Sequence, residues 1–106
     1  MFVDKPSAPK NIHVIEQYKD YITVAWEEPE DNGGMPISGY VVEKRDANRT
    51  MWTGIADVGN DVYKYKATSL YEGNEYLFRV AAENAVGVGQ FAQLEDTVTA
   101  KLPFGK

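Results

Sequence analysis

The sequence predicts an all-β protein, a seven-stranded antiparallel β-sandwich built as one domain. Short segments rich in β-branched and aromatic residues alternate apolar with polar positions, which is the two-residue period of a strand. Turn-forming residues separate these segments at intervals of roughly ten residues, a spacing typical of sandwiches and barrels. No stretch of useful length has the apolar spacing of an amphipathic helix.

Three strands are predicted in the N-terminal half. Their alternating apolar residues are, in order, Ile12 and Val14 in 11–17, Ile22, Val24 and Trp26 in 21–26, and Tyr40 and Val42 in 39–46. Pro29 lacks the N–H that a sheet ladder needs, so it ends the second strand. The stretch 27–39 contains two Pro and three Gly and is therefore predicted to be a loop.

Four strands are predicted in the C-terminal half. The first is a short candidate at 51–58, and the last covers 91–100. Between them, the residues that share an apolar face are Tyr63, Tyr65 and Ala67 in 62–70, and Tyr76, Phe78, Val80 and Ala82 in 76–84. Turn signals separate these strands at Gly59–Asn60, at 71–75 and at 84–90.

Four phrases in this order resemble a fibronectin type III domain. They read PSAPKNIHV, ITVAWEEP, GYVVEKRD and LYEGNEYLFRVAAENAVGVG, and the resemblance runs from Pro6 to about Ala100. The longer phrases DNGGMPISGYVVEKRD and NEYLFRVAAENAVGVG resemble the type III domains of the giant muscle proteins, titin and its twitchin-like relatives. This resemblance implies an immunoglobulin-like sandwich of two sheets.

The resemblance also assigns structural roles to particular residues. Trp26 is expected to fill the space between the sheets with its ring. Tyr76 matches a tyrosine corner, whose hydroxyl returns to the backbone near Leu70 or Glu72. Gly73 suits a position that needs positive φ. The expected structural core is Trp26, Tyr40, Val42, Leu70, Tyr76, Phe78 and Val80.

The two ends of the chain have similar sequences, FVDKPSAP and KLPFGK. In the titin-like group such Phe-, Lys- and Pro-containing phrases connect one domain to the next. We therefore expect residues 1–5 to be the remnant of an inter-domain linker, 6–101 to be the type III domain, and 102–106 to begin the next linker. Chance recurrence in two short tails is the alternative.

Composition restricts the class of partner. The net charge of −5 disfavours nucleic acid, which is bound through Lys and Arg, and no apolar run approaches the ~20 residues of a membrane span. The chain has no Cys, which rules out disulfides within it and favours the cytosol. We expect a monomer with no cofactor, contacting neighbouring domains of its array.

Residues that could support catalysis or metal binding are few. His13 is the single histidine and is expected on the polar face of a strand, without the partners of a catalytic triad. The segment 87–89 reads GVG, but a strand rather than a helix follows it, so a hairpin is expected in place of a phosphate loop. Asn48–Arg49–Thr50 fits a glycosylation sequon, which matters only in a secreted chain. No catalytic, cofactor or metal residue is predicted.

Two charged clusters are candidate partner surfaces. Basic residues beside an aromatic ring could contact a partner, or could simply cover a half-buried sheet face with their stems. The acidic run could hold calcium, dock a basic partner, or form a solvated loop. The residues of the two clusters are Lys44, Arg45, Arg49 and Trp52, and Glu27, Glu28, Glu30 and Asp31.

These observations predict a non-enzymatic module in a long intracellular array, acting as a load-bearing spacer and scaffold. The titin-like resemblance implies myosin or other thick-filament proteins as partners, and the A-band or M-band of the sarcomere as the location. The alternative is an extracellular adhesion or receptor module, which the sequon at Asn48 favours slightly.

Overall fold

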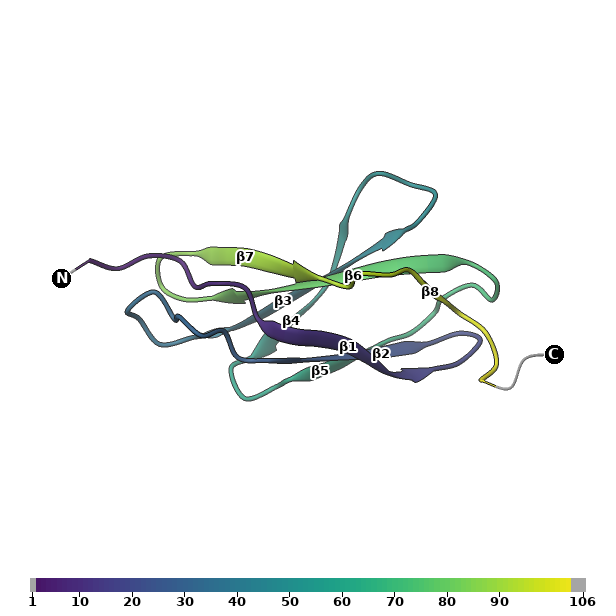
Figure 1. Ribbon diagram of the computed structural model, residues 1–106, viewed down its shortest axis with the longest axis horizontal. Coiled ribbons are helices and arrows are strands. Elements are labelled where there is room, and N and C mark those ends of the chain that lie inside the picture. The colour runs from purple at the N-terminus through teal and green to yellow at the C-terminus, as the bar shows by residue number, and fades with distance from the viewer. Residues whose placement is uncertain (1, 104–106) are drawn as a thin grey trace.

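The computed structural model describes residues 2–103, and these form two packed antiparallel sheets (Figure 1). The three-stranded sheet has the order β1-β2-β5. The five-stranded sheet has the order β4-β3-β6-β7, with β8 also pairing β6. The strands are β1 (Lys10–Gln17), β2 (Ile22–Glu27), β3 (Gly39–Asp46), β4 (Thr53–Gly59), β5 (Lys64–Ala67), β6 (Glu75–Glu83), β7 (Val88–Gln93) and β8 (Val98–Thr99).

The all-β sandwich predicted from the alternation is confirmed, and the last predicted strand differs from the expectation. Instead of one strand over 91–100, the chain forms β7 and the two-residue β8. Between them Leu94 turns inward, where its N–H donates to the Phe78 carbonyl and its side chain is buried. The described residues contain no helix that could cross a membrane.

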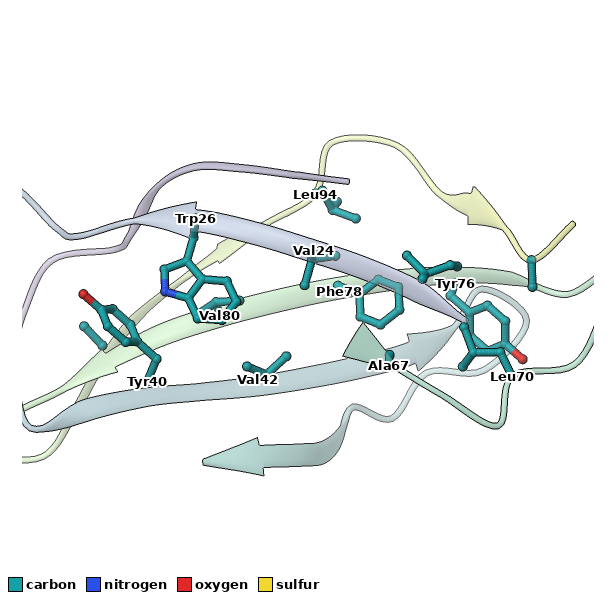
Figure 2. Close-up of a cluster of buried hydrophobic side chains, with 13 residues drawn as sticks. Val24, Trp26, Tyr40, Val42, Ala67, Leu70, Tyr76, Phe78, Val80 and Leu94 are labelled. Atoms are coloured by element: carbon teal, nitrogen blue, oxygen red, sulfur yellow. The ribbon is translucent and has the colours of Figure 1, made fainter. Parts of the chain in front are cut away.

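The core lies between the two sheets and is built from alternate residues of each strand. Figure 2 shows Trp26 and Tyr40 side by side at one end, Phe78 in the middle, and Tyr76 beside Leu70 at the other end. Phe78, Val42 and Val80 are completely buried. All the residues expected to form the core lie in this cluster: Trp26, Tyr40, Val42, Leu70, Tyr76, Phe78 and Val80.

A tyrosine corner fixes the turn before β6. The hydroxyl of the buried Tyr76 accepts a 2.9 Å hydrogen bond from the backbone N–H of Tyr71, so the polar end of the ring is satisfied. Gly73 has φ +91°, the left-handed conformation that glycine adopts without steric cost. The same turn binds the end of the chain, because the Gly73 N–H donates to the Ala100 carbonyl.

The edge strands of the three-stranded sheet are irregular or short. In β1 the pairing with β2 shifts register twice, and Asn11 has a positive φ of 53°. Strand β5 has only four residues, of which Lys64 and Lys66 are exposed. Bulges, short edges and lysines all hinder the addition of a further strand.

The chain enters the sandwich at one end and leaves it at the other (Figure 1). Strand β1 starts at the entry end, where Lys10 pairs with Glu27 at the end of β2. Strand β8 lies at the exit end, where Val98 pairs with Tyr76. We call these two ends the entry pole and the exit pole.

Candidate functional site

At the entry pole, a buried asparagine joins three segments that are distant in sequence. The Asn84 side chain is 4% exposed, and its Nδ2 donates to the carbonyls of Asp4 (2.7 Å) and Asn32 (2.8 Å). Its Oδ1 accepts from the N–H groups of Val86 (2.8 Å) and Gly87 (3.2 Å). Because both polar atoms are fully used, Asn84 fixes the incoming chain against two loops.

Two glycines allow the incoming chain to lie against the domain. A β-carbon on Gly33, which has φ +79°, would lie 2.0 Å from the Asp4 carbonyl oxygen. A β-carbon on Gly89 would lie 2.0 Å from the Pro6 carbonyl oxygen. The Asp4 N–H in turn donates to the Gly33 carbonyl at 2.8 Å. Asp4, which lies within the expected linker remnant, and Pro6, whose carbonyl accepts from the Gln90 N–H at 3.4 Å, are therefore hydrogen-bonded to the sandwich.

The acidic residues Glu27, Glu28, Glu30 and Asp31 lie exposed at the same pole. Asp31 organises its own loop, since its Oδ1 accepts from the Gly33 N–H at 2.8 Å and its carbonyl accepts from the Ser7 N–H at 2.9 Å. Within residues 2–103, no three acidic or histidine side chains converge as metal ligands would. The four carboxylates form an acidic segment at the entry pole.

Three aromatic rings lie beside this acidic segment. Trp26 and Tyr40 have ring centroids 5.6 Å apart, and Tyr40 and Tyr63 have theirs 5.8 Å apart. Figure 2 shows the Trp26 indole nitrogen on the side facing Tyr40. Burial, with smaller contributions from Tyr63 and Glu28, raises the pKa of the Tyr40 hydroxyl to about 12. This hydroxyl is therefore a neutral structural group at physiological pH.

On the outer face of the five-stranded sheet, one arginine is held between two aromatic rings. The Arg79 guanidinium carbon lies 4.4 Å from the Trp52 ring centroid and 4.0 Å from that of Phe91. Glu43, its partner across β3 and β6, accepts from Arg79 Nε at 2.9 Å and from Nη2 at 2.7 Å. This stack satisfies the guanidinium within the sheet, because charge, ring faces and hydrogen bonds are all matched.

The predicted basic cluster is divided between the two faces of this sheet. Arg45 joins Trp52 on the outer face, 5.3 Å from its ring centroid, and donates to the Arg49 carbonyl. Lys44 lies on the inner face, with its amine 5.7 Å from the Tyr76 ring centroid. The Arg49 side chain is exposed at the β3–β4 hairpin. Lys44 and Arg49 are thus separated from the Trp52 stack.

Sequence reasoning missed Arg79, Glu43 and Phe91 in this stack. The two-residue period of the strands could have placed two of them on the outer face. Glu43 follows the inward Val42 and Arg79 precedes the inward Val80, so both charged side chains point outward. The pairing of β3 with β6 then brings them opposite one another. Asn84 was missed for another reason, since the two carbonyls that its amide group binds are 80 and 52 positions away.

The remaining singled-out residues lie apart from these features. His13 is exposed on β1, and its Nδ1 is 2.6 Å from the Asn11 carbonyl oxygen. The expected hairpin turn is formed by residues 84–87, where the backbone N–H of Asn84 and that of Gly87 each donate to the other's carbonyl at 3.1 Å, and Val88 and Gly89 already belong to β7. Asn48 is exposed at the tip of the β3–β4 hairpin.

Comparison with known proteins identifies relatives in sequence. The titin of Drosophila melanogaster is 34% identical over 104 residues, covering 98% of this chain. The human myomesin-2 is 32% identical over 98 residues, and the fast-type myosin-binding protein C of Gallus gallus is 37% identical over 89 residues. The chain spans 1%, 7% and 8% of these three proteins respectively.

Comparison with solved structures also finds a match in titin. Domains A168–A170 of titin match with a TM-score of 0.86 and 27% identity, over 93% of this chain and 33% of that one. The twitchin kinase region of C. elegans matches at a TM-score of 0.87 over 97% of this chain and 18% of that one, with 23% identity, which supports the shared fold alone. The family model of the fibronectin type III domain matches residues 7–97. With this match over most of its length, the chain belongs to the fibronectin type III domain family.

Proposed function

We propose that this domain is a non-enzymatic, load-bearing spacer and docking module in the tandem array of a giant sarcomeric protein. The observation that supports this best is the entry pole, where Asn84 and Gly33 bind the incoming chain to the sandwich. A free linker would leave Asp4 unattached. Here the chain on the N-terminal side is held in one direction, as a rigid spacer requires.

The strand directions favour resistance to a pull on the two ends. Strand β1 starts at the entry pole and pairs with β2, while β7 and β8 lead to the exit pole and pair with β6. A pull along the long axis therefore draws each terminal strand parallel to its own partner. Hydrogen bonds loaded in this direction share the force, so several must break together before the domain opens.

The relatives support an array and a location. Titin, myomesin-2 and myosin-binding protein C are each far longer than this chain, which matches a small part of each. We propose that this domain likewise belongs to a tandem array, with the expected linker segments 1–5 and 102–106 connecting it to its neighbours. Residues 104–106, part of the expected next linker, and Met1 lie outside the described residues.

The proposed partners are the neighbouring domains and, by analogy with the relatives' names, myosin or other thick-filament proteins. The proposed location is the cytoplasm of muscle, in the A-band or M-band of the sarcomere. An M-protein of striated muscle is among the relatives, 33% identical over 98 residues. A titration of this chain against purified myosin fragments tests the docking part, and no binding to any fragment would refute it.

Single-molecule pulling tests the load-bearing part. The chain is placed between marker domains of known strength and stretched through its two ends. We expect opening in one step at forces well above those of a helical bundle, because the terminal strands are loaded along their length. Opening at forces no higher than those of a helical bundle would contradict the proposal.

An extracellular adhesion or receptor module remains the second candidate, supported by one observation. Asn48 of the Asn48–Arg49–Thr50 sequon is exposed at a hairpin tip, where a glycan could be attached. Expression through a secretory route followed by mass analysis tests it. An unmodified Asn48 would remove the one feature that supports this function.

A further inference from the structure

The β3–β4 hairpin projects from the sandwich (Figure 1). Beside it, at the exit pole, lies a hollow of about 290 Å³. Its floor includes Lys44 and Asp46, which share the inner face of β3 with the buried Val42, and the ring of Tyr76 from β6. One wall is the hairpin and the other is the turn before β6. We call this hollow the hairpin groove.

Two large apolar side chains border the hairpin groove from opposite walls. Met51, from the hairpin, is 77% exposed, and Tyr71, from the turn before β6, is 74% exposed. Met adapts its shape to different partners, and Tyr offers a large rigid contact surface. Their exposure is not required by the fold, since the structural role of Tyr71 is carried by its backbone N–H.

The groove also carries positive charge that the protein does not neutralise. Among residues 2–103 the ion pair is Arg79 with Glu43, so neither Lys44 nor Arg49 is paired with a carboxylate. Asp46 is held by its neighbours, with Oδ1 accepting from the Asn48 N–H at 3.0 Å and Oδ2 from Asn74 Nδ2 at 3.2 Å. The groove therefore has two cationic side chains against one carboxylate that is already hydrogen-bonded.

We propose that the hairpin groove docks an acidic peptide segment of a partner protein. The partner's carboxylates meet Lys44 and Arg49, while an apolar side chain inserts between Met51 and Tyr71. Charge complementarity selects this occupant, because a basic segment would meet two like charges and a purely apolar one would leave them unsatisfied. This inference deepens the docking part of the proposed function and rests on it.

The experiment is an NMR titration of the isotope-labelled chain with a short peptide of Asp and Glu that has one central Leu. At about 0.15 M salt, where exposed charges act over only ~8 Å, we expect shifts centred on Met51, Tyr71 and Asn74. The double variant Lys44→Gln/Arg49→Gln should bind about tenfold more weakly, because two charge-assisted contacts are lost. Tyr71→Ser should also weaken binding, while leaving thermal unfolding unchanged.

A matched control separates the groove from net charge. Lys10→Gln/Lys64→Gln removes the same charge from exposed sites on the other sheet and should leave the peptide affinity unchanged. Equal weakening by both double variants, equal binding of a peptide with Lys in place of Asp and Glu, or an absence of shifts in the groove would each overturn the proposal. The pulling experiment does not depend on the groove. A failure of the load-bearing proposal can therefore be distinguished from a failure of the groove proposal.

Discussion

The side-chain amide of Asn84 donates a 2.7 Å hydrogen bond to the carbonyl of Asp4, although the two residues are 80 positions apart. This bond attaches Asp4, which lies within the expected linker remnant 1–5, to the residue that follows β6. The following predictions test this attachment, the packing around it and the charged stack on the outer face.

Asn84→Ala removes a buried side chain that makes four hydrogen bonds. We expect a loss of about 2–4 kcal/mol in the free energy of unfolding, because its partners lose their bonds inside the loops. Hydrogen exchange at the Asp4 N–H should accelerate as well. Asn60→Ala is the control, since that side chain is exposed and makes one bond, to the Ile37 carbonyl at 3.1 Å. Equal urea midpoints for the two variants would contradict the assigned role.

Gly33→Ala should detach the incoming chain, because the new β-carbon would lie 2.0 Å from the Asp4 carbonyl oxygen. Gly73→Ala supplies the matched control. Gly73 also has a positive φ, of +91°, but a β-carbon added there would have no atom within 4 Å. We expect about 1 kcal/mol of backbone strain at Gly73 and at least ~2 kcal/mol at Gly33. Chemical denaturation measures both, and equal losses would show that the contact with Asp4 contributes nothing.

Tyr76→Phe removes the hydroxyl that accepts from the Tyr71 N–H while keeping the buried ring. The expected loss is about 1–2 kcal/mol, because a partly buried donor is left without its partner. Tyr71→Phe alters an exposed side chain and should change the midpoint of thermal unfolding very little. If Tyr76→Phe were as stable as the parent chain, the corner would owe its stability to ring packing alone.

Arg79→Lys keeps the charge on the outer face but loses the planar group that lies against Trp52 and Phe91. We expect a loss of about 1 kcal/mol, since an ammonium cannot stack on both rings or bond Glu43 through two nitrogens. A double-mutant cycle with Glu43→Gln should give a coupling energy of roughly 0.5–1 kcal/mol, because both side chains are about a quarter exposed, 26% and 21%. Urea unfolding of the four proteins measures it. Zero coupling would leave the ion pair without a stabilising role.

Stability should fall between about pH 10 and pH 12 in part through Tyr40. Its pKa is raised to about 12 in the folded chain, mainly by burial, so the unfolded chain releases this proton first. The contribution of neutral Tyr40 to the free energy of unfolding is complete below pH 10 and is lost as the pH rises through 12. For a pKa raised to about 12, this loss is roughly 2–3 kcal/mol. Tyr40→Phe should show a shallower fall over the same range. Identical pH profiles would contradict the assignment.

The core residues and the order of the strands along the chain could be predicted because they depend on local alternation. Trp26, Val42 and Phe78 occupy inward positions that a two-residue period identifies without any knowledge of pairing. The turn at Gly73 followed from the same local chemistry. The β7–β8 break could not be predicted, because it depends on the Leu94 N–H reaching Phe78 on the neighbouring strand.

The candidate surfaces were only partly predictable, because they depend on the face of the sheet on which each side chain near a strand end lies. Lys44, Arg45 and Arg49 are close in sequence, so they read as one cluster, yet successive strand residues point to opposite faces. The structure sends Arg45 to the Trp52 stack and Lys44 to the hairpin groove. The groove also needs Tyr71, which comes from a segment that the sequence does not place near the hairpin.

The irregular edges of the three-stranded sheet affect how this domain would interact with its neighbours in the proposed array. Tethered domains meet one another at effective concentrations on the order of millimolar, which favours the exchange of strands between neighbours. The two register shifts of β1 and the short, lysine-bearing β5 leave no long flat edge on this sheet for a neighbour's strand to join. In the proposed array, these features would hinder the exchange of strands through this sheet when the domain refolds beside similar domains after a stretch.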